Sequence, residues 1–245
     1  MQQYFIKGYP KDIPFHIHDK DTSKHMFQVM RLSDGDEFVA VFEDGIKYLA
    51  RVVNKETQMV EVVHALTENT ELPNQVTIAM GFPKGDKLEF LAQKVTELGA
   101  TQLWAYPADW SVVKWDAKKL VKKAEKLEKI VQGAAQQSKR NQLPKIKLFD
   151  KKQSFLDCLG EFDEIVVAYE EVAKSGEKSR LLNLLKSFPI GSRILFIVGP
   201  EGGLSPNEIT LFKQAGARLV GLGPRILRTE TAPLYLLTAV SLVTE

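Results

Sequence analysis

The sequence contains very little cysteine, since Cys158 is the only one among 245 residues. A single thiol excludes an internal disulfide bond and any zinc site built from several thiolates. No apolar run approaches the roughly 20 residues that a membrane-spanning helix requires, and residues 1–7 lack the layout of a signal peptide. We therefore expect a cytoplasmic protein that does not cross a membrane and does not depend on disulfide bonds.

Common nucleotide-binding and metal-binding motifs are also missing. Residues 199–205 are rich in glycine but do not match the G-x-G-x-x-G pattern of dinucleotide-binding domains. Residues 81–87 lack the spacing and the Lys-Ser/Thr ending of a P-loop. His16 and His18 share one face of a strand, but no carboxylate or thiol at ligand spacing accompanies them. The sequence therefore argues against dinucleotide, nucleoside triphosphate and metal sites.

The overall composition is that of an ordinary globular protein. The hydrophobic fraction is 44% and the charged fraction is 26%, which excludes disordered and collagen-like chains. The length exceeds the commonest domain size of roughly 100 to 150 residues, so we expect two domains.

The first seventy residues are predicted to form a small β-barrel. The predicted strands cover residues 4–7, 15–17, 37–42, 47–53 and 59–64, and a helix is predicted at residues 22–32. Asp44-Gly45 lies between two of these strands and predicts a hairpin with a type I′ turn, in which both central residues have positive φ. Several short strands joined by tight turns favour a closed barrel, because closure removes exposed edges.

From residue 74 to residue 245 the pattern changes to alternating strands and helices. Strands are predicted at residues 76–82, 102–106, 145–149, 164–169, 194–198 and 218–222, and helices at residues 86–98, 116–138, 154–159, 176–188, 206–215 and 233–243. This alternation predicts an α/β domain whose mostly parallel sheet is covered by helices on both faces. Ligands of such domains bind outside the carboxyl ends of the strands.

Two loops of this second domain have the composition of a ligand site. Residues 199–205 follow a predicted strand and lead into a helix, with Ser205 placed as N-cap and Pro206 as first helical residue. Residues 222–232 also follow a strand and carry Arg225, Arg228 and Glu230. Ordinary turns and a solvated salt-bridge group are the alternative interpretations. Two such loops at adjacent strand ends favour a ligand held largely by main-chain groups, which glycine allows to approach closely.

Positive charge is concentrated between Lys114 and Lys147. This stretch contains eleven Lys or Arg residues and only three acidic residues. The predicted helix 116–138 has apolar residues every three or four positions, so one face packs and the other is cationic. Residues 138–142 add hydrogen-bonding groups at its end. The cationic face is suited to phosphate contacts, and a merely solvated face is the alternative.

These motifs together resemble the ribosomal RNA small subunit methyltransferase E family. The resemblance rests on Gly199-Pro-Glu-Gly-Gly-Leu-Ser205, Leu222-Gly-Pro-Arg-Ile-Leu-Arg-Thr-Glu-Thr-Ala232, Lys84-Gly-Asp-Lys-Leu-Glu89, Gln93-Lys-Val-Thr-Glu-Leu-Gly99, Ser111-Val-Val-Lys114, Ala134-Ala-Gln-Gln-Ser-Lys-Arg140, Val29-Met-Arg-Leu32 and Gly35-Asp36. Pro233 and Gln2-Gln3 depart from the family pattern, and the Gln pair implies fewer RNA contacts from the barrel. The resemblance implies a PUA-like, RNA-binding β-barrel at residues 1–70, followed by a SPOUT methyltransferase domain at residues 74–245 with a C-terminal trefoil knot.

The resemblance also implies an activity and its partners. Members of the family transfer a methyl group from S-adenosylmethionine to N3 of one uridine in the 16S ribosomal RNA of the 30S subunit, and SPOUT enzymes act as homodimers. The implied cofactor-binding residues are Ala168, Tyr169, Gly199, Pro200, Glu201, Gly202, Gly203, Leu222, Gly223, Pro224, Ile226, Leu227 and Arg228. The implied RNA-binding residues are Arg31, Lys84, Lys114, Lys139, Arg140 and Arg225.

Three residues are expected to take part in the chemistry. Glu201 or Glu230 is expected to accept the uridine proton if desolvation raises its pKa toward the working pH. Arg228 is expected to stabilise the developing uracil anion. Two other functions remain open from the sequence: a SPOUT enzyme acting on another base or on a ribose 2′-hydroxyl, and a non-catalytic RNA-binding factor for ribosome assembly.

Overall fold

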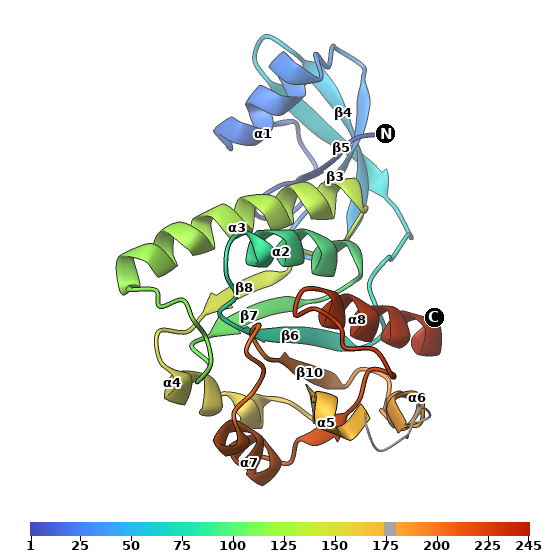
Figure 1. Cartoon of the computed structure of the whole chain (residues 1–245). Helices are drawn as coiled ribbons and strands as arrows, with labels where there is room; N and C mark the ends of the chain where they lie inside the picture. Colours follow the sequence, from blue (N-terminus) through green and yellow to red (C-terminus); the bar gives the residue numbers. More distant parts are fainter. Residues whose placement is uncertain (174–179) are drawn as a thin grey trace. The chain divides into compact units, whose positions relative to one another are not determined.

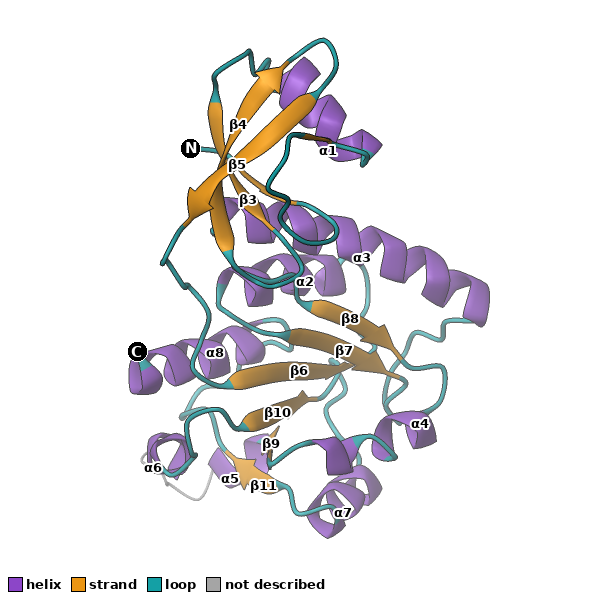
Figure 2. Ribbon diagram, turned by 180° about the vertical axis from the view of Figure 1, so that it is seen from behind, coloured by secondary structure: helices purple, strands orange, loops and turns teal. Residues whose placement is uncertain are grey.

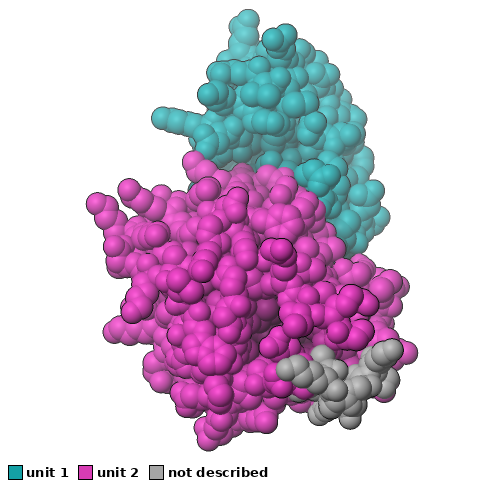
Figure 3. Space-filling model, in the orientation of Figure 1, with its two compact units in different colours: residues 1–71, 135–142 teal, residues 72–134, 143–245 magenta. Residues whose placement is uncertain are grey.

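The computed structural model describes residues 1–173 and 180–245 (Figure 1). The chain divides into two compact units, which are coloured separately in Figure 3. Unit 1 contains residues 1–71 and 135–142, and unit 2 contains residues 72–134 and 143–245. Residues 135–142, which lie inside the predicted second domain, therefore cluster with the first unit. Within the described ranges, no helix is both long enough and apolar enough to span a membrane.

Unit 1 is built on a five-stranded sheet in the order β1-β3-β4-β5-β2 (Figure 2). The strands are β1 (Gln3–Phe5), β2 (Phe15–His16), β3 (Glu37–Val41), β4 (Lys47–Asn54) and β5 (Met59–Ala65). β1 runs parallel to β3, and the other neighbours are antiparallel. All five predicted strands are present, but no pairing joins β1 to β2 among the described residues. The predicted barrel is therefore not closed by backbone hydrogen bonds, because its two end strands are only three and two residues long.

Two local predictions for unit 1 change in the structure. The helix begins earlier than predicted, as α1 (Lys20–Lys24), because Asp19 caps it by accepting a hydrogen bond from the Thr22 N–H at 2.7 Å. The type I′ turn at Asp44-Gly45 is wrong, since only Gly45 has a positive φ, of 74°. The Gly45 N–H donates to the Phe42 carbonyl at 3.0 Å, and the Asp44 carboxylate accepts from the Ile46 N–H at 2.9 Å. The hairpin is thus closed by a wider loop than a two-residue turn.

Unit 2 contains a six-stranded sheet in which every pair of neighbours is parallel, in the order β11-β9-β10-β6-β7-β8. Its strands are β6 (Gln75–Gly81), β7 (Gln102–Tyr106), β8 (Lys145–Leu148), β9 (Glu164–Ala168), β10 (Arg193–Val198) and β11 (Arg218–Val220). Its helices are α2 (Lys87–Glu97), α3 (Ala117–Gln137, of which the last residues belong to unit 1), α4 (Lys152–Leu156), α5 (Glu170–Ala173), α6 (Arg180–Lys186), α7 (Pro206–Gln214) and α8 (Thr231–Thr244). The start of the predicted helix 176–188 lies outside the described residues, and α5 was not predicted.

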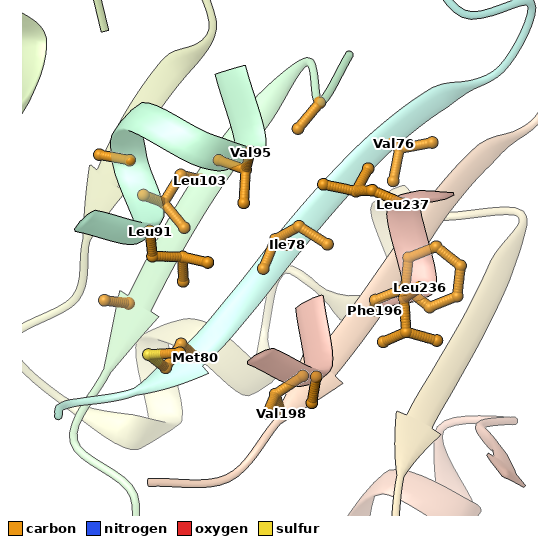
Figure 4. Close-up of a cluster of buried hydrophobic side chains, with 14 of the residues drawn as sticks. Val76, Ile78, Met80, Leu91, Val95, Leu103, Phe196, Val198, Leu236 and Leu237 are labelled. Atoms are coloured by element: carbon orange, nitrogen blue, oxygen red, sulfur yellow. The ribbon is translucent and has the colours of Figure 1, made fainter. Parts of the chain in front are cut away.

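Helices cover both faces of this sheet, as the alternating pattern predicts. Ile78 and Met80 point into a core shared with α2, α3, α6 and α8, part of which is drawn in Figure 4. Ala79, between them on β6, points to the opposite face, where Phe155 of α4 and Phe212 of α7 form a second core. Each fully buried large apolar side chain contributes roughly 1.5 to 3 kcal/mol to folding. Because all six strands are parallel, their carboxyl ends meet at one edge of the sheet.

Candidate functional site

A cavity of about 960 Å³ lies at the carboxyl ends of the strands of unit 2. Its volume is at the upper end of the range of small-molecule sites. The lining comes mainly from the segments that follow β9, β10 and β11, together with Lys87 at the start of α2 and Trp110 after β7. Every residue that was predicted to bind the cofactor lies in this lining. Two loops separated in the sequence therefore form one site.

The loop between β10 and α7 is held in place by the cap of the helix that follows. The Ser205 hydroxyl accepts from the Glu208 N–H at 3.1 Å, and the Ser205 N–H donates to the Glu208 carboxylate at 3.0 Å. Pro206 is the first helical residue, so the predicted N-cap and helix start are confirmed. The backbone folds back tightly here, since a Cβ atom on Gly199 would lie 2.8 Å from the Gly203 carbonyl carbon. Only glycine fits at residue 199 in this conformation.

The loop between β11 and α8 is joined directly to the first loop. The buried Thr229 hydroxyl donates to the Gly199 carbonyl at 2.5 Å. Gly223 has a φ of 94°, a backbone conformation that side chains other than glycine rarely adopt. This hydrogen bond fixes the distance between the two loops, so the cavity between them is preformed.

Three charged side chains from three different segments meet beside the cavity. Lys87 and Glu201 line it, and Glu230 lies behind them, outside the lining. The Lys87 ammonium lies 2.9 Å from Glu201 Oε1 and 3.3 Å from Glu230 Oε2. The Lys84 N–H also donates to Glu201 Oε1, at 3.1 Å. Glu230 Oε2 is buried and makes no hydrogen bond of good geometry within the described part of the chain. We refer to Lys87, Glu201 and Glu230 as the carboxylate cluster.

The electrostatics of the carboxylate cluster differ from the prediction for Glu201. Burial raises the pKa of Glu201, but the hydrogen bonds from Lys87 and from the Lys84 N–H outweigh it and leave the pKa below its ordinary value. The pKa of Lys87 is raised, first by the hydrogen bond to Glu201 and then by Glu230. The upward shift expected for the pKa of Glu201 is therefore wrong. The prediction considered burial alone and did not include the hydrogen bond from Lys87, which lowers the pKa.

The arginines of the second loop are available to a ligand. Arg225 and Arg228 both line the cavity and are exposed. Across residues 1–173 and 180–245, neither guanidinium has an ion-pair partner. The alternative interpretation of a solvated salt-bridge group therefore does not hold for these two side chains, although it describes Glu230, which pairs with Lys87.

The residues predicted to bind RNA fall into two groups. Arg31, Lys84, Lys114, Lys139 and Arg225 are exposed, and the Lys139 ammonium donates to the Met1 carbonyl at 2.8 Å. Arg140 is different, since its side chain is only 2% exposed and donates to the Glu71 carboxylate at 2.8 and 2.5 Å. A buried guanidinium that is already paired with a carboxylate is not accessible to a phosphate group. Arg140 is therefore a structural residue, and the prediction that it contacts RNA is corrected.

The structure also adds residues that the sequence reasoning did not single out. Lys87 and Trp110 line the cavity although neither lies in the two loops. Lys87 begins α2, the helix that follows β6, and Trp110 lies in the segment that follows β7. Segments after strand ends form the edge where parallel sheets bind ligands, and this placement could have identified both residues. No group of three or more metal-ligating side chains is present in the part of the chain that the structure describes.

Comparison with known proteins agrees with this architecture. The family model of the RNA methyltransferase domain matches residues 70–241, and that of the RNA methyltransferase PUA domain matches residues 19–58. The ribosomal RNA small subunit methyltransferase E of Bacillus subtilis (strain 168) is 43% identical over 250 residues, covering 100% of this chain and 98% of the relative. The enzyme of the same name from Mesomycoplasma hyopneumoniae (strain 232) is 29% identical, covering 97% of this chain and 98% of the relative.

Solved structures agree with the same grouping. The crystal structure of a hypothetical protein, 40% identical, superposes with a TM-score of 0.89 and covers 100% of this chain and 99% of that one. The ribosomal RNA small subunit methyltransferase E of Neisseria gonorrhoeae, bound to S-adenosyl methionine, is 25% identical with a TM-score of 0.78, covering 99% of this chain and 96% of that one. On the full-length identity and the domain match, the chain belongs to the ribosomal RNA small subunit methyltransferase E family.

Proposed function

We propose that this chain transfers a methyl group from S-adenosylmethionine to N3 of one uridine in the 16S ribosomal RNA of the small subunit. The observation that carries the proposal is the cavity formed by the loops after β10 and β11, in a chain that is 43% identical to the Bacillus subtilis enzyme over its full length. The relative from Neisseria gonorrhoeae is bound to S-adenosyl methionine, and it shares the fold over nearly all of this chain.

The cavity has the chemistry that this cofactor requires. Glycine backbone at residues 199, 202 and 203 allows main-chain groups to approach a ligand closely. Leu222, Ile226 and Leu227 supply apolar surface for an adenine ring. The nearby carboxylates provide negative charge beside a positively charged donor. The loops at residues 199–203 and 222–228, with Ala168 and Tyr169 at the side, would hold the cofactor.

When bound, S-adenosylmethionine supplies an electrophilic methyl group on a sulfonium centre. The protein then has to orient the uracil ring and remove the proton from its N3. Alignment of two reactants in a preformed site lowers the barrier by several kcal/mol. A carboxylate of the cluster would take the N3 proton as N3 bonds to the methyl carbon and the methyl–sulfur bond breaks.

Glu230 is the better proton acceptor of the two carboxylates. Glu201 already accepts hydrogen bonds from Lys87 and from the Lys84 N–H, and its pKa is lowered, so it is a weak base. Glu230 Oε2 is buried, and among the described residues its contact is the longer one to the Lys87 ammonium, at 3.3 Å and without good hydrogen-bond geometry. Lys87 holds both carboxylates in place as a positioning residue. Arg228, exposed in the cavity lining, stabilises the negative charge that develops on the uracil ring.

The remaining residues are proposed to bind the RNA around the target uridine. Residues 1–70 would form an RNA-binding domain, and residues 74–245 the methyltransferase domain. Arg31, Lys84, Lys114, Lys139 and Arg225 are exposed cations suited to phosphate contacts. The target base must leave its stack to reach the cavity. Ribosomal RNA is a cytoplasmic substrate, so the protein is proposed to act there.

Two finer features of the fold belong to the proposal. A trefoil knot would result if the segment 222–232 passes through the loop closed by residues 199–205, and the Thr229 to Gly199 hydrogen bond supports this threading. A homodimer is supported by the exposed apolar residues of α8, Tyr235 and Leu242, which are 46% and 80% exposed. Sedimentation of the purified chain tests the dimer, since an active monomer would contradict it.

Calorimetry with S-adenosylmethionine and the full chain tests the cofactor directly. We expect saturable binding with one molecule per chain. A matched variant, Gly199→Ala, is expected to abolish binding, because the added Cβ collides with the Gly203 backbone. Absence of binding to the folded wild-type chain would leave an RNA-binding function without catalysis.

A further inference from the structure

Trp110 is a large aromatic side chain of the cavity lining that is about half exposed to solvent, at 48%. The other two tryptophans, Trp104 and Trp115, are buried at 1% and 8% exposure. Large aromatic residues are usually well buried, so an exposed indole at the rim of a site is a candidate for contact with a ligand. The two loops of the sequence motifs do not include this residue.

The backbone around Trp110 is held rigidly. The Asp109 N–H donates to the buried Glu208 carboxylate at 3.1 Å, and the Asp109 carboxylate accepts from the Ser205 hydroxyl at 2.6 Å and pairs with Lys152. On the other side, the Ser111 N–H donates to the Ala108 carbonyl at 3.0 Å. The half-exposed side chain therefore stands on a segment that is fixed on both sides. Little conformational entropy remains to be lost when a ligand packs against it.

Trp110 also lies directly against the glycine loop of the cavity. A Cβ atom on Gly202 would lie 3.0 Å from Trp110 Cβ, and one on Gly203 would lie 3.9 Å from the edge of the indole ring. The backbone and Cβ of Trp110 thus lie against Gly202, where a side chain would crowd them, and the edge of the indole lies beside Gly203. On the opposite loop, Ile226 is 80% exposed and lines the same cavity.

From this arrangement we infer that Trp110 is the stacking surface for the uracil ring that receives the methyl group. Single unstacked bases are recognised by proteins through stacking on aromatic side chains. An indole offers a flat apolar face of the right size, while the cations of the cavity, Arg225 and Arg228, suit the charge of the RNA. The inference rests on the proposed function, since it assigns one residue to the acceptor base of that reaction.

The test uses the full chain with purified 16S ribosomal RNA from a strain that lacks the enzyme. Trp110→Ala is expected to raise the KM for RNA about 5- to 150-fold, the range for loss of one base–aromatic stack. Trp110→Phe is expected to keep most of the wild-type affinity for RNA. Trp110→Leu is expected to be nearly as weak as Trp110→Ala, since leucine is apolar but cannot stack. Val112→Ala removes another exposed apolar side chain that lies outside the cavity lining, and it is the matched control.

Two readouts separate stacking from a structural role. The affinity for S-adenosylmethionine, measured by calorimetry, is expected to be unchanged in all Trp110 variants, which also shows that the site has folded. The fluorescence of the wild-type chain is expected to be quenched on adding RNA, and Trp110→Phe is expected to lose that quenching, because the other two tryptophans are buried.

The outcomes distinguish this inference from the proposed function. If the wild-type chain binds RNA but its fluorescence is not quenched, or if Trp110→Ala has a normal KM for RNA, stacking on Trp110 is wrong while the methyltransferase function stands. If Trp110→Ala instead loses affinity for S-adenosylmethionine with its KM for RNA unchanged, the indole packs against the cofactor and the inference is also wrong. Failure of the wild-type chain to methylate uridine N3 would count against the proposed function. Quenching of the Trp110 fluorescence by RNA would still show whether a base stacks on this side chain.

Discussion

Each unit of the molecule contains a small group of carboxylates and cations, and the two groups are satisfied to different degrees. In unit 1, Glu71 accepts hydrogen bonds from Arg140, from the Asn141 N–H at 2.7 Å and from Gln142 at 2.8 Å. In the carboxylate cluster of unit 2, one ammonium serves both Glu201 and Glu230, and Glu230 Oε2 lacks a hydrogen bond in the described residues.

The exposure of the two groups differs in the same direction. Arg140 and Glu71 are 2% and 13% exposed, whereas Lys87, Glu201 and Glu230 are 26%, 25% and 18% exposed. Burial raises the pKa of Glu71, but the hydrogen bonds from Arg140 and its neighbours leave the pKa below its ordinary value. A carboxylate that is fully bonded in the interior stabilises the fold and cannot take a proton easily. A carboxylate near a cavity that accepts fewer hydrogen bonds can take a proton from a substrate.

The largest effect is expected from breaking the Glu71–Arg140 pair. Arg140→Ala leaves a buried carboxylate without its main partner and should lower the free energy of unfolding by about 3 to 5 kcal/mol. Urea unfolding followed by circular dichroism measures it. The control is Arg193→Ala, which removes the exposed Arg193–Asp163 pair (51% and 46% exposed) and should leave the free energy of unfolding nearly unchanged. Similar losses of unfolding free energy in the two variants would show that the buried pair stabilises the fold no more than the exposed pair does.

The next effect compares the two carboxylates of the carboxylate cluster. Glu230→Gln removes the proposed proton acceptor and should lower the single-turnover rate of methylation by about 100-fold or more. Glu201→Gln should lower it less, because the amide oxygen still accepts the hydrogen bonds from Lys87 and Lys84. Rates are measured at saturating RNA and cofactor. A larger loss in Glu201→Gln would assign the base to Glu201, and near-normal rates in both would exclude either as the base.

The smallest effect is expected from Lys87→Met, which leaves both carboxylates in place without the shared cation. The pKa of Glu201 should rise toward its ordinary value, since the hydrogen bond from Lys87 lowers it. Glu201 would then take up a proton at higher pH, which changes the charge beside the proposed base, so the acidic limb of the pH–rate profile should move to higher pH. The rate at neutral pH should fall by about tenfold, the value of one hydrogen bond to a charged group. Lys87→Arg should retain the wild-type profile, and an unshifted profile in Lys87→Met would remove Lys87 from the mechanism.

Much of the fold follows from periodicity and local signals. The alternation of strands and helices after residue 74 predicts the parallel sheet with two covered faces, because buried parallel strands are apolar throughout and helices are amphipathic. Ser205 and Pro206 mark the start of α7 by cap chemistry alone. The parallel direction of the strands brings the two loops to one edge of the sheet. The expectation that they follow adjacent strands is wrong, because β9 lies between β10 and β11.

Other features depend on contacts between distant residues. In the sequence, Arg140 is one of several cations at the end of a basic helix. Its burial follows from its contact with Glu71, which lies 69 residues away in the sequence. Lys87 meets Glu201 and Glu230 through three separate segments. The sequence does not predict whether Trp110 is buried in the core or exposed beside the cavity, because its exposure depends on the conformation of the segment after β7. Sequence patterns report local conformation, and these contacts are set by tertiary packing.

The most direct test of the central claim is mass mapping of 16S ribosomal RNA from a deletion strain, with and without the purified protein and S-adenosylmethionine. We expect one added methyl group at N3 of a single uridine, which appears only when both protein and cofactor are present. A methyl group on another base or on a ribose 2′-hydroxyl, or no added mass in the presence of bound cofactor, would contradict it.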